Sequence, residues 1–481
     1  MADPSSSPGP AGGASVFARA RTWLVSVRLR PRQGKELAAR AGIALLFVVL
    51  LLAHTRLLRP VLQNGDSAVY NQQIETGDFS NRTTHIGYIA LGSLFNRLPF
   101  GTDLNMNVMV LTVGVLGLAA LYASARSLSG SRWAALASAL LALGVPSQLR
   151  GMLLSEVDVV SASTIAISYA CFLRGAPLIA GVVFGFSVLV TPISGPMLVV
   201  FLLTVSVSEH GLKASALRHT VKMAKWGAAA ALVYLPIVWA HYDDYVHGGR
   251  GLLHASRAAY AWPERLARSW GFLGREGGLI LPLCLVGALA CLASVRIWRI
   301  GQPALALLVS VLVMSLAAER FADVPVQLPN LLLLTLLPAV ALVVSPWASR
   351  VGAPLVLAVG FFTLRGNYAR ISAEIEGRER DRRLCVGIRE QSRPRVPVLV
   401  GVSGWTPQRM FERYASADSR SPPVFDARQF ARKVGWLAAS DGYQVWFIRR
   451  VPQHQLAPLL RKYSLETRTV EARALQVLVP K

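Results

Sequence analysis

Three carboxylates in the first third of the chain lie in polar stretches between long apolar runs. Asp66 follows the first apolar run, in a Gly-Asp-Ser segment that begins at Gly65, and Glu156 and Asp158 precede a later run. A carboxylate at the surface of a membrane can take a proton from an acceptor while a lipid-tethered substrate stays in the bilayer. A single loop aspartate more often caps a helix or faces water, so the residue types alone leave both interpretations open.

A second group of candidate residues consists of arginines in the polar segment 241–276 and at the outer ends of apolar runs. A guanidinium group presents two parallel N–H donors, which match the oxygens of a phosphate. Long basic side chains at such positions also extend toward lipid headgroups without a specific ligand, and the sequence favours neither interpretation. The candidates are Arg250, Arg257, Arg320 and Arg365.

The composition indicates that most of these 481 residues face lipid. Hydrophobic residues make up 53% of the chain, charged residues only 16%, and the mean hydropathy is +0.44. A soluble protein of this length is less apolar. In a membrane protein, a formal net charge of +24 first indicates basic cytoplasmic loops and anionic lipids, so we expect no nucleic acid partner. Residues 1–40 are predicted to form a basic, partly disordered cytoplasmic arm.

Apolar runs long enough to cross about 30 Å of hydrocarbon as helices recur through residues 41–365. The run 176–208 is too long for one straight span, and two prolines and a glycine at 191–196 predict two short helices. The other predicted spans are 41–59, 105–126, 132–146, 158–174, 222–240, 277–295, 302–318, 328–345 and 351–365. Together they predict about 11 transmembrane helices and a long first outer loop at 60–104.

Loop charges predict the orientation of these spans. Lys and Arg collect in one set of short loops, whereas Asp and Glu collect in the other set, which includes 60–104, 147–157 and 241–276. Because basic loops stay in the cytoplasm, the N-terminus is predicted inside. The odd number of spans then places residues 366–481 outside, and one miscounted span reverses that side.

Residues 366–481 are predicted to form a small soluble α/β domain. Hydropathy falls at about residue 366, and short β-branched runs alternate with helical patterns from there on. The strands are predicted at 396–402, 443–449 and 466–479, and the helices near 410–414, 427–438 and 454–462.

Short motifs within residues 40–210 resemble those of the GT-C glycosyltransferases, and most nearly the protein O-mannosyltransferase-like branch. The Gly-Asp-Ser segment 65–67, followed by His-Ile-Gly-Tyr at 85–88 and an apolar helix, is similar to the first outer loop of that branch. The Ser-Glu-Val-Asp segment 155–158 is similar to an element that opens its fourth span. The chain departs from the branch at Ala68-Val69, which replace Gly-Glu, and at Ile86, which stands for two prolines.

The resemblance implies a GT-C-like polytopic helical protein of the cytoplasmic (inner) membrane, with an inverting glycosyltransferase activity. The donor would be a polyprenyl-phosphate-linked sugar, first a mannose-like hexose, and the acceptor an extracytoplasmic protein, lipid or glycan. Asp66 takes the position of the catalytic base, or of a ligand to Mg or Mn, and Glu156 is a second carboxylate. His85, Tyr88 and Asp158 correspond to the donor pocket, whose phosphate the outer arginines would hold.

Two other functions compete with this interpretation. A transporter or flippase for a lipid-linked solute would carry charges inside the membrane and a two-fold internal repeat, and the sequence shows neither. A catalytically inactive GT-C-like scaffold would keep the fold while the motifs diverge, and this chain departs from the branch at Asp158 as well, where a tyrosine is usual.

Overall fold

The computed structural model describes most of the helical region and the C-terminal sheet. The chain divides into two compact units, Met1–Leu52 and Ala53–Lys481. In the first unit, the described residues belong to helix α2 (Gly34–Thr55), which carries the first predicted span. Most of the predicted arm 1–40 lies outside the described residues. These residues are 34–62, 65–77, 85–191, 221, 225, 232–240, 261–293, 324–342, 348–393, 395–401, 411, 413–415, 424–425, 443–448, 453–457 and 459–481.

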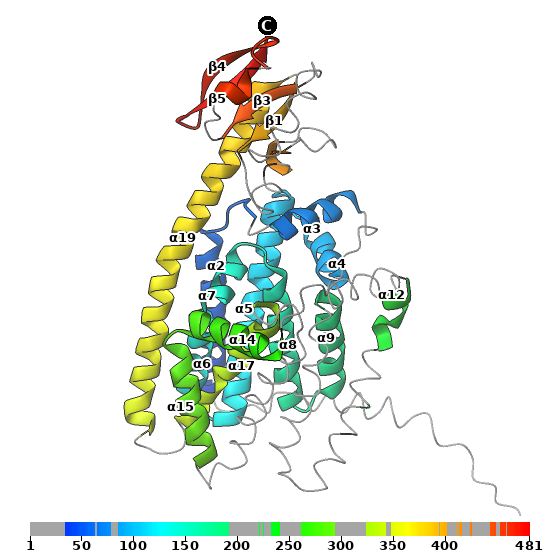
Figure 1. Cartoon of the computed structure of the whole chain (residues 1–481). Coiled ribbons are helices and arrows are strands. Elements are labelled where there is room, and N and C mark those ends of the chain that lie inside the picture. The colour runs from blue at the N-terminus through cyan, green and yellow to red at the C-terminus, as the bar shows by residue number, and fades with distance from the viewer. Residues whose placement is uncertain are drawn as a thin grey trace, which may run out of the picture. The chain divides into compact units, whose positions relative to one another are not determined.

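A bundle of apolar helices forms the larger part of the second unit (Figure 1). Helix α5 (Thr102–Ser129) packs against α6 (Arg132–Leu143) and α8 (Val157–Leu173), and α8 packs against α9 (Pro177–Val190). Small residues allow these close approaches, because a Cβ atom on Gly117 of α5 would lie only 2.6 Å from the Ser163 side chain of α8. Helix α9 ends at Val190, directly before the predicted break at 191–196.

One described helix, α5, is long and apolar enough to cross a membrane alone. The number rises to three if each of two bent pairs counts as one span. These pairs are α6 with α7 (Pro146–Leu153), bent by 70°, and α14 (Trp262–Gly277) with α15 (Ile280–Ala293), bent by 105°. The predicted total of eleven stays a prediction, because several predicted spans, including 302–318, lie outside the described residues.

Two predicted outer loops contain helices that the sequence interpretation missed. Helix α7 occupies most of the predicted loop 147–157, because Pro146 has the fixed φ of a first helical turn and ends the preceding helix. Helix α14 occupies the end of the predicted loop 241–276. The described part of the predicted span 328–345 contains most of α17 (Val324–Leu334) and all of α18 (Leu336–Ala341). The described end of 222–240 contains η2 (Leu232–Tyr234) and α12 (Leu235–Ala240).

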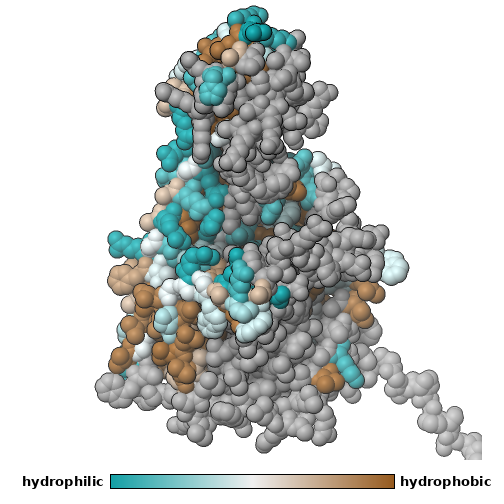
Figure 2. All heavy atoms as spheres, in the orientation of Figure 1, coloured by the Kyte–Doolittle hydropathy of each residue, from teal (hydrophilic) through white to brown (hydrophobic). Residues whose placement is uncertain are grey.

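Helix α19 (Ala353–Ser392) begins within the last predicted span, 351–365, and continues far beyond the predicted end of that span. Good helix formers and pairs of opposite charge follow residue 365, including Glu374 with Arg378 at 2.7 Å. The fall in hydropathy therefore marks a change of surroundings and not the end of the helix. Its N-terminal half exposes Leu355, Phe361 and Phe362. In Figure 2, brown hydrophobic residues gather at the lower left of the view, and teal hydrophilic residues are more frequent above them.

A five-stranded mixed sheet follows α19, in the order β2-β1-β3-β5-β4. Strand β1 (Val396–Val400) is parallel to β2 (Val424–Phe425) and to β3 (Tyr443–Phe447), whereas β5 (Arg473–Pro480) is antiparallel to β3. The single strand predicted at 466–479 is wrong. It is a hairpin of β4 (Tyr463–Val470) and β5, joined by Glu471 and Ala472, whose φ values of 47° and 60° suit a two-residue hairpin turn.

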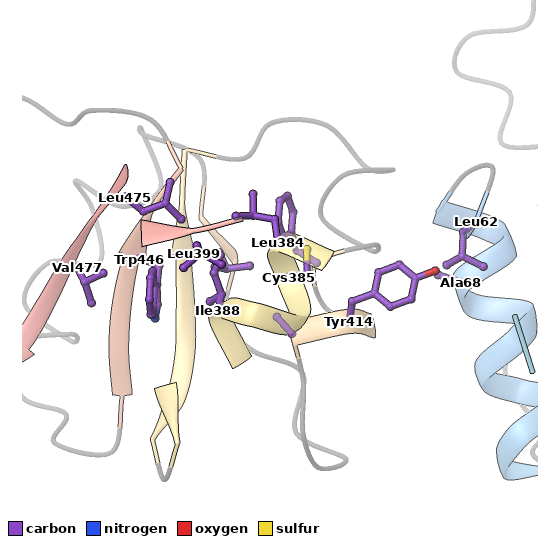
Figure 3. Packing of buried hydrophobic residues seen from close by; sticks show 13 residues of the cluster. Leu62, Ala68, Leu384, Cys385, Ile388, Leu399, Tyr414, Trp446, Leu475 and Val477 are labelled. Carbon is purple, nitrogen blue, oxygen red and sulfur yellow. The ribbon is translucent and has the colours of Figure 1, made fainter. Parts of the chain in front are cut away.

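Alternate residues of the strands pack into hydrophobic clusters on the two faces of the sheet. Val398, Val400 and Val445 pack with Leu456 of α22 (Gln453–Leu456). This short helix begins one residue before the longer helix predicted at 454–462 and ends six residues before its predicted end. The other cluster includes residues of α19 and extends into the predicted first outer loop (Figure 3). Its members are Leu62, Ala68, Leu384, Cys385, Ile388, Leu399, Phe411, Tyr414, Ala415, Trp446, Val470, Leu475 and Val477.

Candidate functional site

Two short helices in the segment 60–104, the predicted first outer loop, carry the first of the predicted site residues. Helix α3 (Gly65–Thr76) has Asp66 in its first turn, where a carboxylate interacts favourably with the helix dipole. Asp66 is solvent-exposed, and Tyr70 lies four residues later on the same side of the helix. Helix α4 (Ile86–Phe95) follows His85 and contains buried Tyr88.

The turn before α8 joins both of these helices. The Ser155 carbonyl oxygen accepts hydrogen bonds from the Ser67 hydroxyl at 3.3 Å and from the Tyr88 hydroxyl at 3.2 Å. Ser155 itself has a φ of 53°, in the left-handed region that residues other than glycine seldom adopt. The two bonds therefore fix α3 and α4 against the strained turn that leads directly to Glu156.

The ring of Tyr70 contacts the rings of two predicted site residues, His85 and Tyr88. Its ring centroid is 5.1 Å from that of His85 and 5.7 Å from that of Tyr88, with edge-on geometry in both pairs. Burial raises the pKa of the Tyr70 phenol well above its ordinary value, and the charges of Asp66 and Asp158 raise it further. The phenol therefore stays protonated and can donate a hydrogen bond. Sequence interpretation missed Tyr70, although its spacing of four residues from Asp66 is a usable signal.

His85 connects the site to the end of α9. Its Nδ1 atom lies 2.6 Å from the Val190 carbonyl oxygen. Because a carbonyl only accepts, Nδ1 carries the proton, and Nε2 is the unprotonated, accepting nitrogen of the neutral ring. Burial lowers the pKa of His85, and this effect outweighs the opposite effects of the Val190 hydrogen bond and of Asp66. His85 is therefore neutral at pH 7.

This lowered pKa predicts a specific sensitivity to acid. An unfolded histidine titrates near pH 6.5, so below that pH the unfolded chain binds a proton that the folded His85 rejects. The fold thus loses stability as the pH falls from about 6.5 toward the folded pKa. We expect His85→Gln, which can still donate to Val190, to reduce the loss of thermal stability between about pH 7.5 and pH 5.5. Thermal unfolding in detergent measures it, and equal losses in both proteins would contradict the prediction.

Glu156 is the N-cap residue of α8 and lies near Tyr88. It is only 8% exposed, and its charge acts on the Tyr88 phenol. A Cβ atom on Gly151 of α7 would lie 2.8 Å from the Glu156 Oε2 atom, so the glycine leaves room for this carboxylate. Asp158, in the first turn of α8, is near enough to Tyr70 to act on its phenol. The structure therefore brings together all five predicted residues of the three segments around 66, 85 and 156.

The predicted phosphate-binding arginines are not part of this cluster as far as the structure describes it. Arg250, Arg257 and Arg320 lie outside the described residues. Arg365 is exposed on α19, and in the described ranges no interaction joins it to Tyr70, His85 or Tyr88. The described residues also contain no group of three or more His, Cys, Asp or Glu side chains that could hold a metal ion.

Comparison with known proteins identifies the fold. No family model matches the chain, and no curated protein matches it. The crystal structure of ArnT from Cupriavidus metallidurans in the apo state is similar with a TM-score of 0.62 and 15% identity, over 92% of this chain and 98% of that one. Its complex with undecaprenyl phosphate is similar with a TM-score of 0.60 and 15% identity, over 91% and 98%.

The Archaeoglobus fulgidus oligosaccharyltransferase is more distant, with a TM-score of 0.45 and 14% identity over 79% of this chain and 63% of that one. ArnT, in contrast, is matched over nearly its whole length. The chain is therefore a polytopic helical membrane protein with the GT-C fold.

Proposed function

We propose that the chain is a membrane glycosyltransferase that moves a sugar from a polyprenyl-phosphate carrier to an acceptor outside the cytoplasm. The observation that carries this proposal is the grouping of Asp66, Glu156 and Asp158 around Tyr70 and Tyr88. These residues come from three separate segments, and each segment is one that resembles a GT-C motif. The undecaprenyl phosphate bound by the structurally similar ArnT supports a polyprenyl phosphate as the carrier.

In this proposal Asp66 is the general base. An acceptor hydroxyl gives its proton to the Asp66 carboxylate while its oxygen attacks the anomeric carbon of the donor. The bond from that carbon to the carrier phosphate breaks at the same time, so the sugar inverts and the polyprenyl phosphate leaves. The exposure of Asp66 suits this role, because a base must meet an acceptor that arrives from water.

The surrounding groups would position the donor. Tyr70 keeps its proton and can donate a hydrogen bond to a sugar hydroxyl, and neutral His85 has an accepting nitrogen at Nε2. Glu156 and Asp158 are acceptors for further sugar hydroxyls. Arg250, Arg257, Arg320 and Arg365 are the proposed ligands of the carrier phosphate. The proposed donor sugar is a mannose-like hexose, and the proposed acceptor is an extracytoplasmic protein, lipid or glycan.

The experiment is a donor turnover assay with the purified full-length protein. Polyprenyl-phosphate mannose is supplied as the first donor, then other hexoses, and the bare polyprenyl phosphate that is released is measured. We expect release that depends on the protein and rises when an acceptor is present. Flux of the lipid-linked sugar across vesicles without release would instead indicate a transporter, and the absence of both would indicate a scaffold.

A further inference from the structure

Helix α3 presents different residues to two neighbouring structures. Asp66, Ser67 and Tyr70 take part in the site described above. Ala68, Asn71 and Glu75 recur at spacings of three and four residues, so they share another side of the helix. A polar helix of 12 residues is not stable on its own, so contacts with its surroundings must hold it in place, and this second side supplies contacts beyond the Ser67 hydrogen bond.

The contacts on the second side come from the C-terminal region. Arg413 makes a two-pronged pair with Glu75, with Nη2 donating to Oε1 at 2.7 Å and Nη1 donating to Oε2 at 3.1 Å. Its Nε atom also donates to the Asp103 Oδ1 atom at 2.9 Å. The Asn71 amide donates to the same Asp103 oxygen at 2.8 Å. One guanidinium thus joins the C-terminal region to α3 and to the first turn of α5.

This pair is better protected from water than an ordinary surface salt bridge. The side chains of Arg413 and Asp103 are only 13% and 11% exposed, although Glu75 is 41% exposed. Burial by itself lowers the pKa of Arg413, but Asp103 and Glu75 raise it above its ordinary value, so the guanidinium stays charged. Removing one partner would leave a largely buried charge unpaired, which is a costly change.

Hydrophobic contacts reinforce the same connection. Leu62 and Ala68, just before and within α3, belong to one buried cluster with Tyr414 and with Trp446 of the sheet. In Figure 3 the Tyr414 ring points from the C-terminal region toward Leu62 and Ala68. The Tyr414 hydroxyl donates to the Pro60 carbonyl oxygen at 3.3 Å. The predicted outer loop and the C-terminal region therefore share a hydrophobic core.

We propose that Arg413 is a positioning residue, through which the C-terminal α/β region holds α3 and thereby sets the place of Asp66. The catalytic part of this inference rests on the proposed function, but the structural part does not. Among the described residues, the hydrogen-bond partners of Arg413 are Glu75 and Asp103, and the proposed base Asp66 is not one of them. Arg413 acts through Glu75 and Asp103 on a helix whose other side carries the base.

The test compares Arg413→Ala with a matched control, Arg473→Ala, in the full-length protein. Arg473 of β5 also pairs with an acidic residue, Asp381 of α19, but at 3.7 Å and with both side chains more than half exposed. Hydrogen exchange measured by mass spectrometry follows two peptides, 65–76 of α3 and 463–480 of the β4–β5 hairpin. We expect Arg413→Ala to speed exchange in α3 by about tenfold or more, and Arg473→Ala to change neither peptide.

A second pair of variants covers the case in which Arg413→Ala unfolds the C-terminal region. Glu75→Gln removes the charged, two-pronged partner of Arg413 on α3 and leaves the C-terminal sequence intact. It should speed exchange in α3 similarly, and combining it with Arg413→Ala should add little, because both remove the same interaction. Unchanged exchange in α3 of Glu75→Gln, or additive effects in the double variant, would overturn the proposal.

Donor turnover then separates positioning from general stability. With equal amounts of folded protein, we expect Arg413→Ala to lower kcat by about 10-fold to 100-fold while the KM for the donor changes by less than about threefold. Equal kcat in both arginine variants, with α3 loosened only in Arg413→Ala, would overturn the link to catalysis. A wild-type protein without donor turnover would contradict the proposed function, and the exchange results would still decide whether Arg413 holds α3.

Discussion

Replacing Asp66 with asparagine should abolish most sugar transfer while the protein still folds and inserts into the membrane. Loss of a positioned general base typically lowers a rate by about 10²-fold to 10⁴-fold. Asparagine keeps the size of the side chain, and the exposed position of Asp66 allows the change without a buried unpaired group. The measurement is polyprenyl phosphate release per folded protein, at several donor concentrations. We expect the loss in kcat, because the proton is transferred only in the reacting complex.

The matched control for this experiment is Asp381→Asn. Asp381 is an exposed aspartate of α19, paired only loosely with Arg473 at 3.7 Å, so its loss should leave turnover unchanged. Normal turnover by both variants would show that Asp66 is not the base. Loss of turnover in both would point to a general effect of charge. If Asp66→Asn binds donor normally but does not turn it over, the acceptor side of the mechanism is supported.

The sequence identifies residues that the structure brings together, but it predicts the helices that carry them less well. Asp66, His85, Tyr88, Glu156 and Asp158 are each recognisable from short motifs, and the structure brings their three segments together. Local patterns do not, however, reveal how segments lie in space. Nothing near residue 155 in the sequence predicts that its carbonyl oxygen holds both α3 and α4.

Two errors of interpretation have clear physical causes. The continuation of α19 to Ser392 was not predicted because a drop in hydropathy resembles the end of a helix, whereas the backbone responds to helix propensity and to pairs such as Glu374 with Arg378. The sequence predicts one strand at 466–479 instead of the hairpin 463–480, because neither Glu471 nor Ala472 is a typical residue for positive φ. Arg413 could not be identified either, because its partner Glu75 lies 338 residues away in the sequence.

Gly87 is the position near the site where a single methyl group should do most damage. A Cβ atom there would lie 2.8 Å from the Val190 nitrogen and 2.9 Å from the Leu189 carbonyl carbon. Both are backbone atoms at the end of α9, so they cannot rotate away as a side chain can. The same stretch of backbone supplies the Val190 carbonyl that holds His85. This contact explains in steric terms why a glycine follows two residues after the histidine in the His-Ile-Gly-Tyr segment.

We expect Gly87→Ala to push α4 away from α9 and to shift His85 and Tyr88 relative to Asp66. A displacement of about 1 Å at a catalytic group can lower kcat/KM by about 10²-fold, and overpacking of this kind costs about 1–3 kcal/mol of stability. Donor turnover and thermal unfolding in detergent measure the two effects. The matched control is Gly366→Ala in α19, where a Cβ atom meets nothing within 4 Å.

The control should be neutral or slightly stabilising, because alanine favours a helix over glycine by up to about 1 kcal/mol. The comparison therefore separates a steric effect at the site from the general effect of adding a methyl group to a helix. Wild-type turnover and stability in Gly87→Ala would mean that α4 and α9 do not approach as closely as the structure places them. The His85 hydrogen bond to Val190 would then lose its support, and with it the neutral tautomer that the site requires.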